Sequence, residues 1–267
     1  MDIESILSRA VDALSSLPSV SGIVLGGSRA TGTASESADI DIGVYYEAFD
    51  AEGLNRAASR IDDEKRPGLI GPEGSWGNWV NCGGWLITEG IHTDIICRDI
   101  NRVTSVIEEC GRGSFTNNYQ PGHPHSYVSA MYMGELAVSK VLYARDRAFL
   151  ELKESAEAYP DALSRSLIDF FMFEAEFSLN FAKKSKEDES YLSGHLYRSA
   201  SSLNQVIFAL NQEYCINEKK AAKRIDGFKK RPENYSKRLN SVFASGSSAE
   251  KCRVLESLID DVKKIAV

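Results

Sequence analysis

The sequence lacks the features that mark several common protein classes. In its 267 residues no apolar run approaches the roughly 20 residues of a membrane-spanning helix, and the residues after Met1 are acidic rather than basic, so we expect neither a membrane segment nor a signal peptide. The five cysteines include no Cys-x-x-Cys pair, which argues against a zinc site. A net charge of −7 argues against duplex nucleic acid as the main partner, because phosphate binding needs a basic surface. We therefore expect a cytoplasmic protein with reduced cysteines that fill small apolar spaces.

The remaining composition is that of an ordinary globular protein, with 43% hydrophobic and 26% charged residues. Its most informative stretch is residues 22–45. An apolar, β-branched run at 23–25 predicts a buried strand, and Gly26-Gly27-Ser28 interrupts it. Glycine lets backbone approach a ligand closely, and a serine at the start of a short helix can bind phosphate. By itself this segment is more typical of a simple tight turn that binds nothing.

Residues 38–46 predict a second strand that carries two acids. Asp39 and Asp41 stand two positions apart, so on a strand they share a face at a spacing of about 6–7 Å, while Ile40 and Ile42 point into a core. Carboxylates held this close repel one another unless a cation lies between them. Mg²⁺ commonly uses one or two carboxylates together with substrate phosphates. The pair could also be two acids facing solvent, but the glycine-serine turn eleven positions before Asp39 makes a metal-phosphate site the more specific interpretation.

A third acid stands on a predicted β-hairpin. Residues 85–88 and 91–98 predict strands joined at Glu89-Gly90, and on the second strand His92 and Asp94 share a face. This strand should pair near Asp41. An acid among apolar residues is rarely buried without a partner or a metal, so we take Asp94 as a third member of the site. The alternative is an edge-strand acid that faces water.

Together these residues resemble a known family. Gly27-Ser28-Arg29-Ala30-x-Gly32 followed by Asp39-Ile40-Asp41 resembles the signature of the DNA polymerase β-like nucleotidyltransferase superfamily, and its bacterial small-molecule branch, which includes antibiotic nucleotidyltransferases, is the nearest likeness. The motif-bearing part covers roughly the first hundred residues. Thr31 stands where many members have a basic residue, and Ala38 where many have serine; neither position is a metal ligand in the family.

The resemblance implies an enzyme of the nucleotidyltransferase type. It implies that Asp39, Asp41 and Asp94 are catalytic and bind two Mg²⁺ ions, with Asp94 matching the third carboxylate of the signature. It also implies that an NTP such as ATP binds at Gly27, Ser28 and Arg29, and that a nucleoside monophosphate passes to a hydroxyl of a small molecule, an aminoglycoside- or lincosamide-like antibiotic being one candidate (antibiotic resistance). The alternatives are a protein nucleotidylyltransferase that AMPylates a side chain, as in toxin–antitoxin systems, and a nucleotide-binding regulator without catalysis.

The second half of the sequence has a different composition. It is helical and poor in β-type residues, with Phe-rich residues 163–183 and amphipathic residues 249–265. We expect an α+β protein: a nucleotidyltransferase domain at 1–145, with a mixed β-sheet and flanking helices, and a C-terminal helical bundle at 146–267. The oligomeric state is left open between monomer and homodimer.

Several charged residues outside the motif are further candidates. Lys219 and Lys220 belong to a basic cluster at 217–231, which either reaches the triphosphate or is a solvated helix. Glu135 lies in a predicted helix at 127–142 and either faces the acceptor or pairs with Lys140 or Arg145. Glu176 belongs to a stripe that is either an acidic acceptor wall or a solvated face. With Glu135 and Glu176, His92 completes the tentative acceptor-binding set, and Glu135 rivals Asp94 as general base.

Overall fold

The computed structural model describes residues 3–185, 187–244 and 246–266. The chain forms two compact units: one comprises residues 1–108, 120–122 and 132–158, the other residues 109–119, 123–131 and 159–267. The predicted boundary at 145/146 stays a prediction. The first two residues of the predicted first domain and the last residue of the predicted second domain lie outside the described part of the chain.

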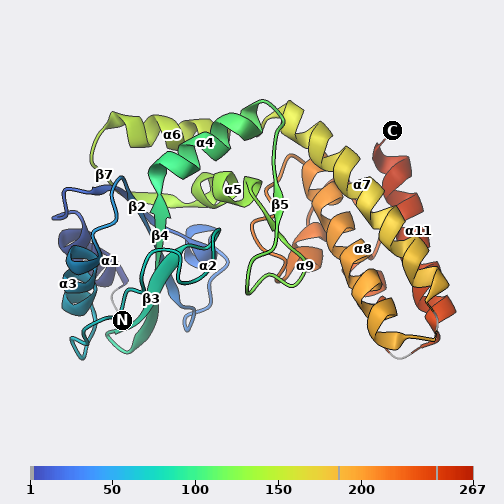
Figure 1. Cartoon of the computed structure of the whole chain (residues 1–267), viewed down its shortest axis with the longest axis horizontal. Helices are drawn as coiled ribbons and strands as arrows, with labels where there is room; N and C mark the ends of the chain where they lie inside the picture. Colours follow the sequence, from blue (N-terminus) through green and yellow to red (C-terminus); the bar gives the residue numbers. More distant parts are fainter. Residues whose placement is uncertain (1–2, 186, 245, 267) are drawn as a thin grey trace. The chain divides into compact units, whose positions relative to one another are not determined.

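The elements of the first half are α1 (Ile3–Leu14), β1 (Val20–Leu25), α2 (Gly27–Ala30), β2 (Ile40–Tyr46), α3 (Ala51–Ile61), β3 (Cys82–Thr88), β4 (Ile91–Asp99) and α4 (Ile100–Gly111). Those of the second half are β5 (Asn117–Asn118), β6 (Tyr127–Val128), α5 (Ala130–Val138), β7 (Lys140–Ala144), α6 (Arg147–Glu157), α7 (Asp161–Lys184), α8 (Glu189–Leu210), α9 (Ala221–Ile225), α10 (Tyr235–Val242) and α11 (Ser248–Ala266). A sheet with flanking helices followed by helices alone confirms the predicted α+β class (Figure 1).

The first unit is built on a five-stranded mixed sheet in the order β3-β4-β2-β1-β7. β2 and β4 are parallel, whereas β1 pairs antiparallel with both β2 and β7, and β3 pairs antiparallel with β4. Because β2 and β4 run in the same direction side by side, the acids near their N-terminal ends lie at the same end of the sheet.

One face of this sheet is the hydrophobic core. Alternation along β2 buries Ile40, Ile42 and Val44, and α1 and α3 contribute Leu14 and Leu54 to the same cluster. At roughly 25 cal/mol per Å² of buried apolar surface, this packing is a main source of the stability of the unit. The opposite face carries the odd-numbered residues of β2. Burial of Ile40 and Ile42 in the core therefore turns Asp41 to that opposite face.

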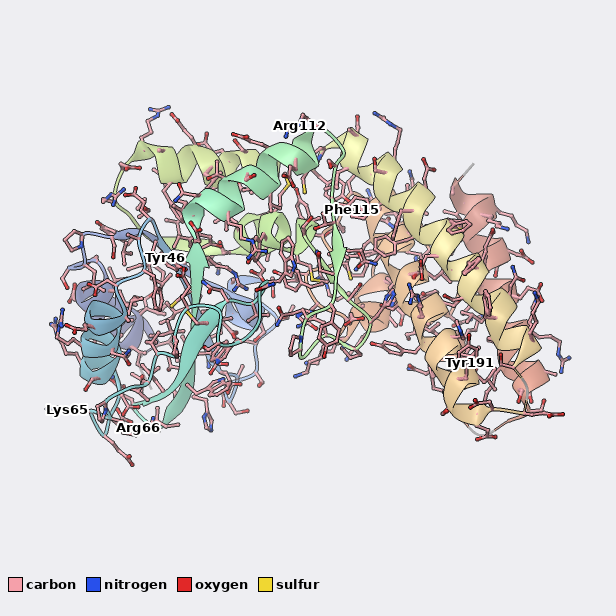
Figure 2. The ribbon with its side chains drawn as sticks, viewed as in Figure 1. Tyr46, Lys65, Arg66, Arg112, Phe115 and Tyr191 are labelled. Carbon is pink, nitrogen blue, oxygen red and sulfur yellow. The ribbon has the colours of Figure 1, made fainter. Side chains whose placement is uncertain are left out.

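The loop between α3 and β3 is held against the sheet by polar contacts. The hydroxyl of Tyr46, labelled in Figure 2, donates to Glu73 Oε1 at 2.5 Å and accepts from Asn81 Nδ2 at 2.8 Å. Asn81 Oδ1 in turn accepts from the N–H of Gly74 at 2.9 Å. Residues 73–81 are therefore held against the end of β2 without forming a strand.

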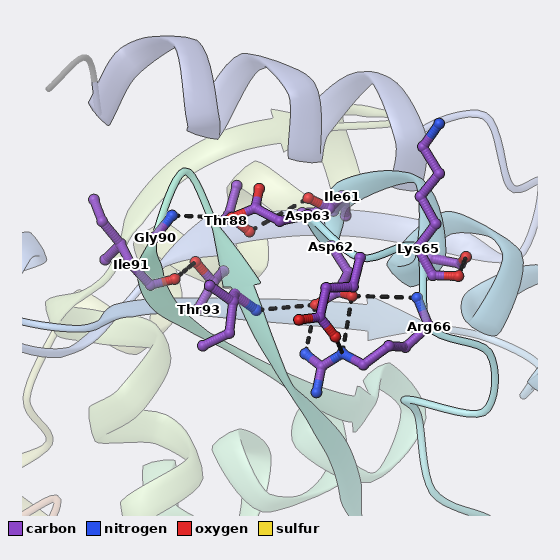
Figure 3. A network of polar contacts seen from close by, with 12 residues as sticks. Ile61, Asp62, Asp63, Lys65, Arg66, Thr88, Gly90, Ile91 and Thr93 are labelled. Carbon is purple, nitrogen blue, oxygen red and sulfur yellow. Dashed lines mark hydrogen bonds and ion pairs between the residues drawn. The ribbon is translucent and has the colours of Figure 1, made fainter.

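The β3–β4 hairpin is fixed by two acids that follow α3 (Figure 3). The fully buried carboxylate of Asp62 accepts from the N–H of Ile87 at 3.0 Å and from Arg66 Nε at 3.0 Å. The Asp63 carboxylate accepts from the N–H groups of both turn residues, Glu89 at 2.8 Å and Gly90 at 2.9 Å. These bonds hold the turn that sets which residues of β3 and β4 stand opposite one another.

The structure corrects one predicted helix. Within residues 127–142 only the short helix α5 is helical: β6 precedes it, and β7 follows it and pairs with β1. The short apolar run of β7 continues the pattern of the helix before it, and a run this short cannot be assigned to strand or helix by periodicity. β7 is held by pairing with a strand more than a hundred residues earlier.

The second unit is mainly helical. α7, α8 and α11 pack side by side (Figure 1), and Phe115 stacks on Phe171 of α7 with ring centroids 5.9 Å apart. The basic segment 217–231 contains the short helix α9. Within the described residues, no helix combines the length and apolar character needed to cross a bilayer. All five cysteines are buried thiols outside disulfide bonds, as expected for apolar fillers.

Candidate active site

Two of the predicted acids stand directly opposite one another. Asp41 of β2 and Asp94 of β4 are partners in the parallel register, on the face turned away from the core, and both are partly buried. Neighbouring strands lie about 4.8 Å apart, so the two side chains leave adjacent backbones toward the same space. Asp39, which precedes the first residue of β2, is exposed.

The acids affect one another electrostatically. The pKa of Asp41 is raised by burial and by the negative charge of Asp39, while Arg29 opposes the rise. The pKa of Asp94 is raised by burial and then by Asp41 and Asp39, while His92 opposes the rise. Two partly buried carboxylates that repel one another and the exposed Asp39 favour a bound cation or a bound proton.

The glycine turn fits closely around Asp41. Gly27 has a φ of +59°, and a Cβ at this position would lie 1.7 Å from Asp41 Oδ2. The N–H of Gly26 donates to the carbonyl of Asp41 at 2.8 Å. Glycine is thus required at residue 27 for two reasons, its left-handed backbone and the carboxylate beside it. Ser28 follows in the short helix α2, as predicted.

Arg29, predicted to bind nucleotide, contacts the chain itself. Its Nε donates to the carbonyls of Ala38 and Asp39, both at 3.1 Å, and its Nη2 donates to the carbonyls of Ala38 and Glu36. These bonds hold the loop that leads into β2 and so position Asp39. Contact with a nucleotide stays a prediction for this side chain.

Sequence reasoning missed an aromatic neighbour of Asp94. Trp85 of β3 is the register partner of Asp94, on the same face of the sheet, and its side chain is 65% exposed. The sequence contained the information needed to find it. A two-residue turn at Glu89-Gly90 pairs residue 88 with residue 91, and each step away from the turn adds one pair, so that residue 85 stands opposite residue 94. The hairpin prediction, now confirmed, therefore already placed residue 85 beside residue 94.

The remaining predicted residues are placed as follows. His92 is exposed on the same face of β4 as Asp94. Glu135 forms a bidentate ion pair with Arg98, with N–O distances of 2.8–3.0 Å. The two alternatives given for Glu135, facing the acceptor and pairing with Lys140 or Arg145, stay predictions. Arg145 contacts Glu47.

Three predicted residues belong to the second unit. Glu176 of α7 is partly buried and forms an ion pair with Lys263 of α11. Lys219 and Lys220 are exposed and precede α9. Their roles in binding the acceptor or the nucleotide stay predictions.

Comparison with known proteins identifies the N-terminal part of the chain. Residues 7–70 match the sequence family described as "Nucleotidyltransferase domain". This part of the chain is similar to a nucleotidyltransferase domain. The matched stretch of this domain contains the glycine turn, Asp39 and Asp41, whereas Asp94 lies beyond it. A nucleotidyltransferase is an enzyme that uses a nucleoside triphosphate.

Other comparisons are more distant. The nucleotidyltransferase-like protein from Exiguobacterium sibiricum is 9% identical with a TM-score of 0.44, over 99% of this chain and 78% of that chain. The CdnC:HORMA-deltaN complex of E. coli MS115-1 is 12% identical with a TM-score of 0.26, over 96% of this chain and 88% of that chain. No curated protein sequence matches. Likenesses this distant add nothing about the substrate of the nucleotidyltransferase domain.

The donor atoms suit a hard divalent cation. Among the residues that the structure describes, no group of three or more His, Cys, Asp or Glu side chains is arranged to hold a metal ion by itself. Mg²⁺ rarely needs such a cage, because it is usually held by one or two carboxylates plus waters and substrate phosphates. Asp41 and Asp94, in register and partly buried, are the two carboxylates that could hold such a cation.

Proposed function

We propose that the protein transfers a nucleoside monophosphate from an NTP to a hydroxyl of a small-molecule acceptor in a Mg²⁺-dependent reaction. The observation that supports this most is the parallel register of Asp41 and Asp94, with Asp39 just ahead of β2 and the Gly27 turn beside Asp41. The match of residues 7–70 to the nucleotidyltransferase domain family gives the reaction class.

The three aspartates are the proposed ligands of two Mg²⁺ ions. When bound, Mg²⁺ neutralises charge on the triphosphate and lowers the pKa of the acceptor hydroxyl. Asp94, whose pKa burial raises, takes the proton from that hydroxyl. The acceptor oxygen then bonds to the α-phosphorus as the bond from this phosphorus to the pyrophosphate oxygen breaks.

The turn that follows β1 is the proposed phosphate-binding element. The N–H groups near Gly27 and the hydroxyl of Ser28 bind the β- and γ-phosphates, while Arg29 keeps the Asp39 loop in place. In this class of reaction, positioning and electrostatic stabilisation account for most of the rate. Lys219 and Lys220 are kept as proposed nucleotide-binding residues, and alanine at both positions should then raise the KM for the NTP.

The acceptor is proposed to be a polar or cationic ring compound, with an aminoglycoside- or lincosamide-like antibiotic as the candidate. Labelled ATP, GTP, CTP and UTP should be incubated with the protein and Mg²⁺, with and without such compounds. Label on the small molecule with release of pyrophosphate supports the proposal. Label on protein favours a protein nucleotidylyltransferase, and tight NTP binding without pyrophosphate release from any acceptor favours a regulator.

A further inference from the structure

One row of residues crosses the sheet near the N-terminal ends of β2 and β4. From β1 toward the edge, the chain places Gly26, Asp41, Asp94 and Trp85 side by side. The glycine turn lies at one end of this row, and an indole lies at the other. With strands about 4.8 Å apart, the Trp85 backbone stands roughly one strand spacing from Asp94 and two from Asp41.

Trp85 is the most exposed of the three tryptophans and packs on one of the others. Its ring stacks on that of Trp76, with centroids 4.7 Å apart and planes 21° apart. Even so, 65% of its side chain remains exposed. A large aromatic side chain left this open beside a catalytic candidate commonly marks a contact surface, because covering it with a ligand is favourable.

The supporting ring is fixed by its loop. The N–H of Trp76 donates to the carbonyl of Asn81 at 2.8 Å, and its own carbonyl accepts from Gln120 Nε2 at 2.5 Å. Gly83, on the same face of β3, leaves room for the ring: a Cβ there would lie 2.7 Å from Trp76. The two indoles therefore form a preorganised platform, and its Trp85 face lies next to the carboxylates.

We propose that the outer face of Trp85 binds a ring of the acceptor and so selects acceptors whose hydroxyl lies close to a ring that can rest on an indole. This rests on the proposed function. The phosphates are assigned to the Gly27 end of the row, and the hydroxyl to Asp94, so Trp85 lies on the acceptor side. An indole face binds an unsaturated ring by stacking and an ammonium-bearing ring by cation–π attraction.

The platform can be tested by binding in the absence of turnover. Isothermal titration calorimetry with Mg²⁺ and a non-hydrolysable α,β-methylene NTP would compare lincomycin, adenosine and guanosine, kanamycin and the uncharged sugar trehalose. We expect a ring compound to bind the wild type and its Kd to rise about tenfold in Trp85→Ala, which corresponds to about 1.4 kcal/mol. In Trp85→Phe an unsaturated ring should keep most of its affinity, whereas an ammonium-bearing sugar should lose more of it, because the phenyl face attracts cations less than indole does.

Trp79, in the loop that also carries Trp76, provides a matched control. Trp79 packs on Tyr132 at 5.6 Å, and the Arg102 guanidinium lies 4.1 Å from its ring centroid. Trp79→Phe should leave the Kd of the ring compounds unchanged. Three outcomes would each overturn the platform. In Trp85→Ala, these are unchanged binding of every compound, or a raised KM for the NTP instead of the acceptor. In the wild type, the outcome is that no ring compound binds.

Failure of the platform can be told apart from failure of the reaction. If the wild type releases pyrophosphate with an acceptor but Trp85→Ala does so with an unchanged acceptor KM, the platform is wrong and the transferase stands. If no NTP gives pyrophosphate yet a ring compound still binds in a Trp85-dependent way, the platform stands and the reaction is wrong.

Discussion

Replacing Gly27 by alanine should damage the enzyme in two separable ways. A residue with a side chain in the left-handed region costs about 1–2 kcal/mol, and Gly27 has a φ of +59°. In addition, the new Cβ would lie 1.7 Å from Asp41 Oδ2, whereas ordinary contacts begin near 3.4 Å. The Asp41 carboxylate must therefore move by about 1.7 Å. Since a displacement of about 1 Å at a reacting centre can cost on the order of a hundredfold, we expect kcat to fall at least that far.

Gly32 provides the matched control. It also has a positive φ, +71°, but nothing lies within 4 Å of the place where its Cβ would be. Gly32→Ala therefore carries the backbone strain without touching Asp41. Both variants should lose a few degrees of Tm, because about 1–2 kcal/mol corresponds to roughly 2–8 °C in a protein of this size.

The assay is pyrophosphate release with the best NTP and acceptor, alongside thermal unfolding of both variants. The account requires Gly27→Ala to be nearly inactive and Gly32→Ala to be nearly as active as the wild type, at similar Tm. Activity of Gly27→Ala within threefold of the wild type would show that the position of the Asp41 carboxylate does not control the reaction. Equal loss of activity in both variants would trace the effect to backbone strain alone.

Three other changes test parts of the account. Asp41→Asn should abolish pyrophosphate release while Tm stays level or rises, because it removes repulsion between carboxylates; a folded, fully active variant refutes the site. Asp62→Asn should lower Tm at pH 7, because the buried carboxylate holds Arg66 and the hairpin. Since these bonds depress the pKa of Asp62 below 3.8, its contribution is complete above about pH 4 and fades as pH falls toward the lower folded pKa. The Tm gap to the wild type should therefore narrow at pH 3, and a gap independent of pH contradicts this. Glu135→Ala removes the carboxylate that the buried Arg98 faces and should cost about 3 kcal/mol in urea unfolding. A paired Arg98→Met, Glu135→Leu variant should restore part of this loss, and no loss in Glu135→Ala would mean that the ion pair is unimportant.

Much of the site was readable from local pattern. Alternation along residues 38–46 and 91–98 placed Asp41 and Asp94 on faces opposite to buried residues, and the register confirms those faces. The Glu89-Gly90 turn was readable because glycine suits the positive φ that a tight hairpin turn needs. In the structure both turn residues adopt positive φ. Such features depend on neighbours within a few positions, which is why a single sequence reveals them.

Features that depend on distant partners were not readable. β7 is a strand because β1 lies beside it, and Glu135 pairs with a residue 37 positions earlier in the chain. Arg29 was assigned to the nucleotide by family pattern, yet its donors hold carbonyls of the loop before β2. Only the folded chain shows which long side chains serve the protein itself.

The most direct test of the central claim is pyrophosphate release by Asp94→Asn, measured against the wild type with each NTP, an accepted small molecule, and either Mg²⁺ or EDTA. Asp94 is the acid that lies outside the matched family segment and enters the site through the register of β2 and β4. The account predicts Mg²⁺-dependent release by the wild type and none above background by a folded Asp94→Asn. Release by this variant at the wild-type rate would contradict it.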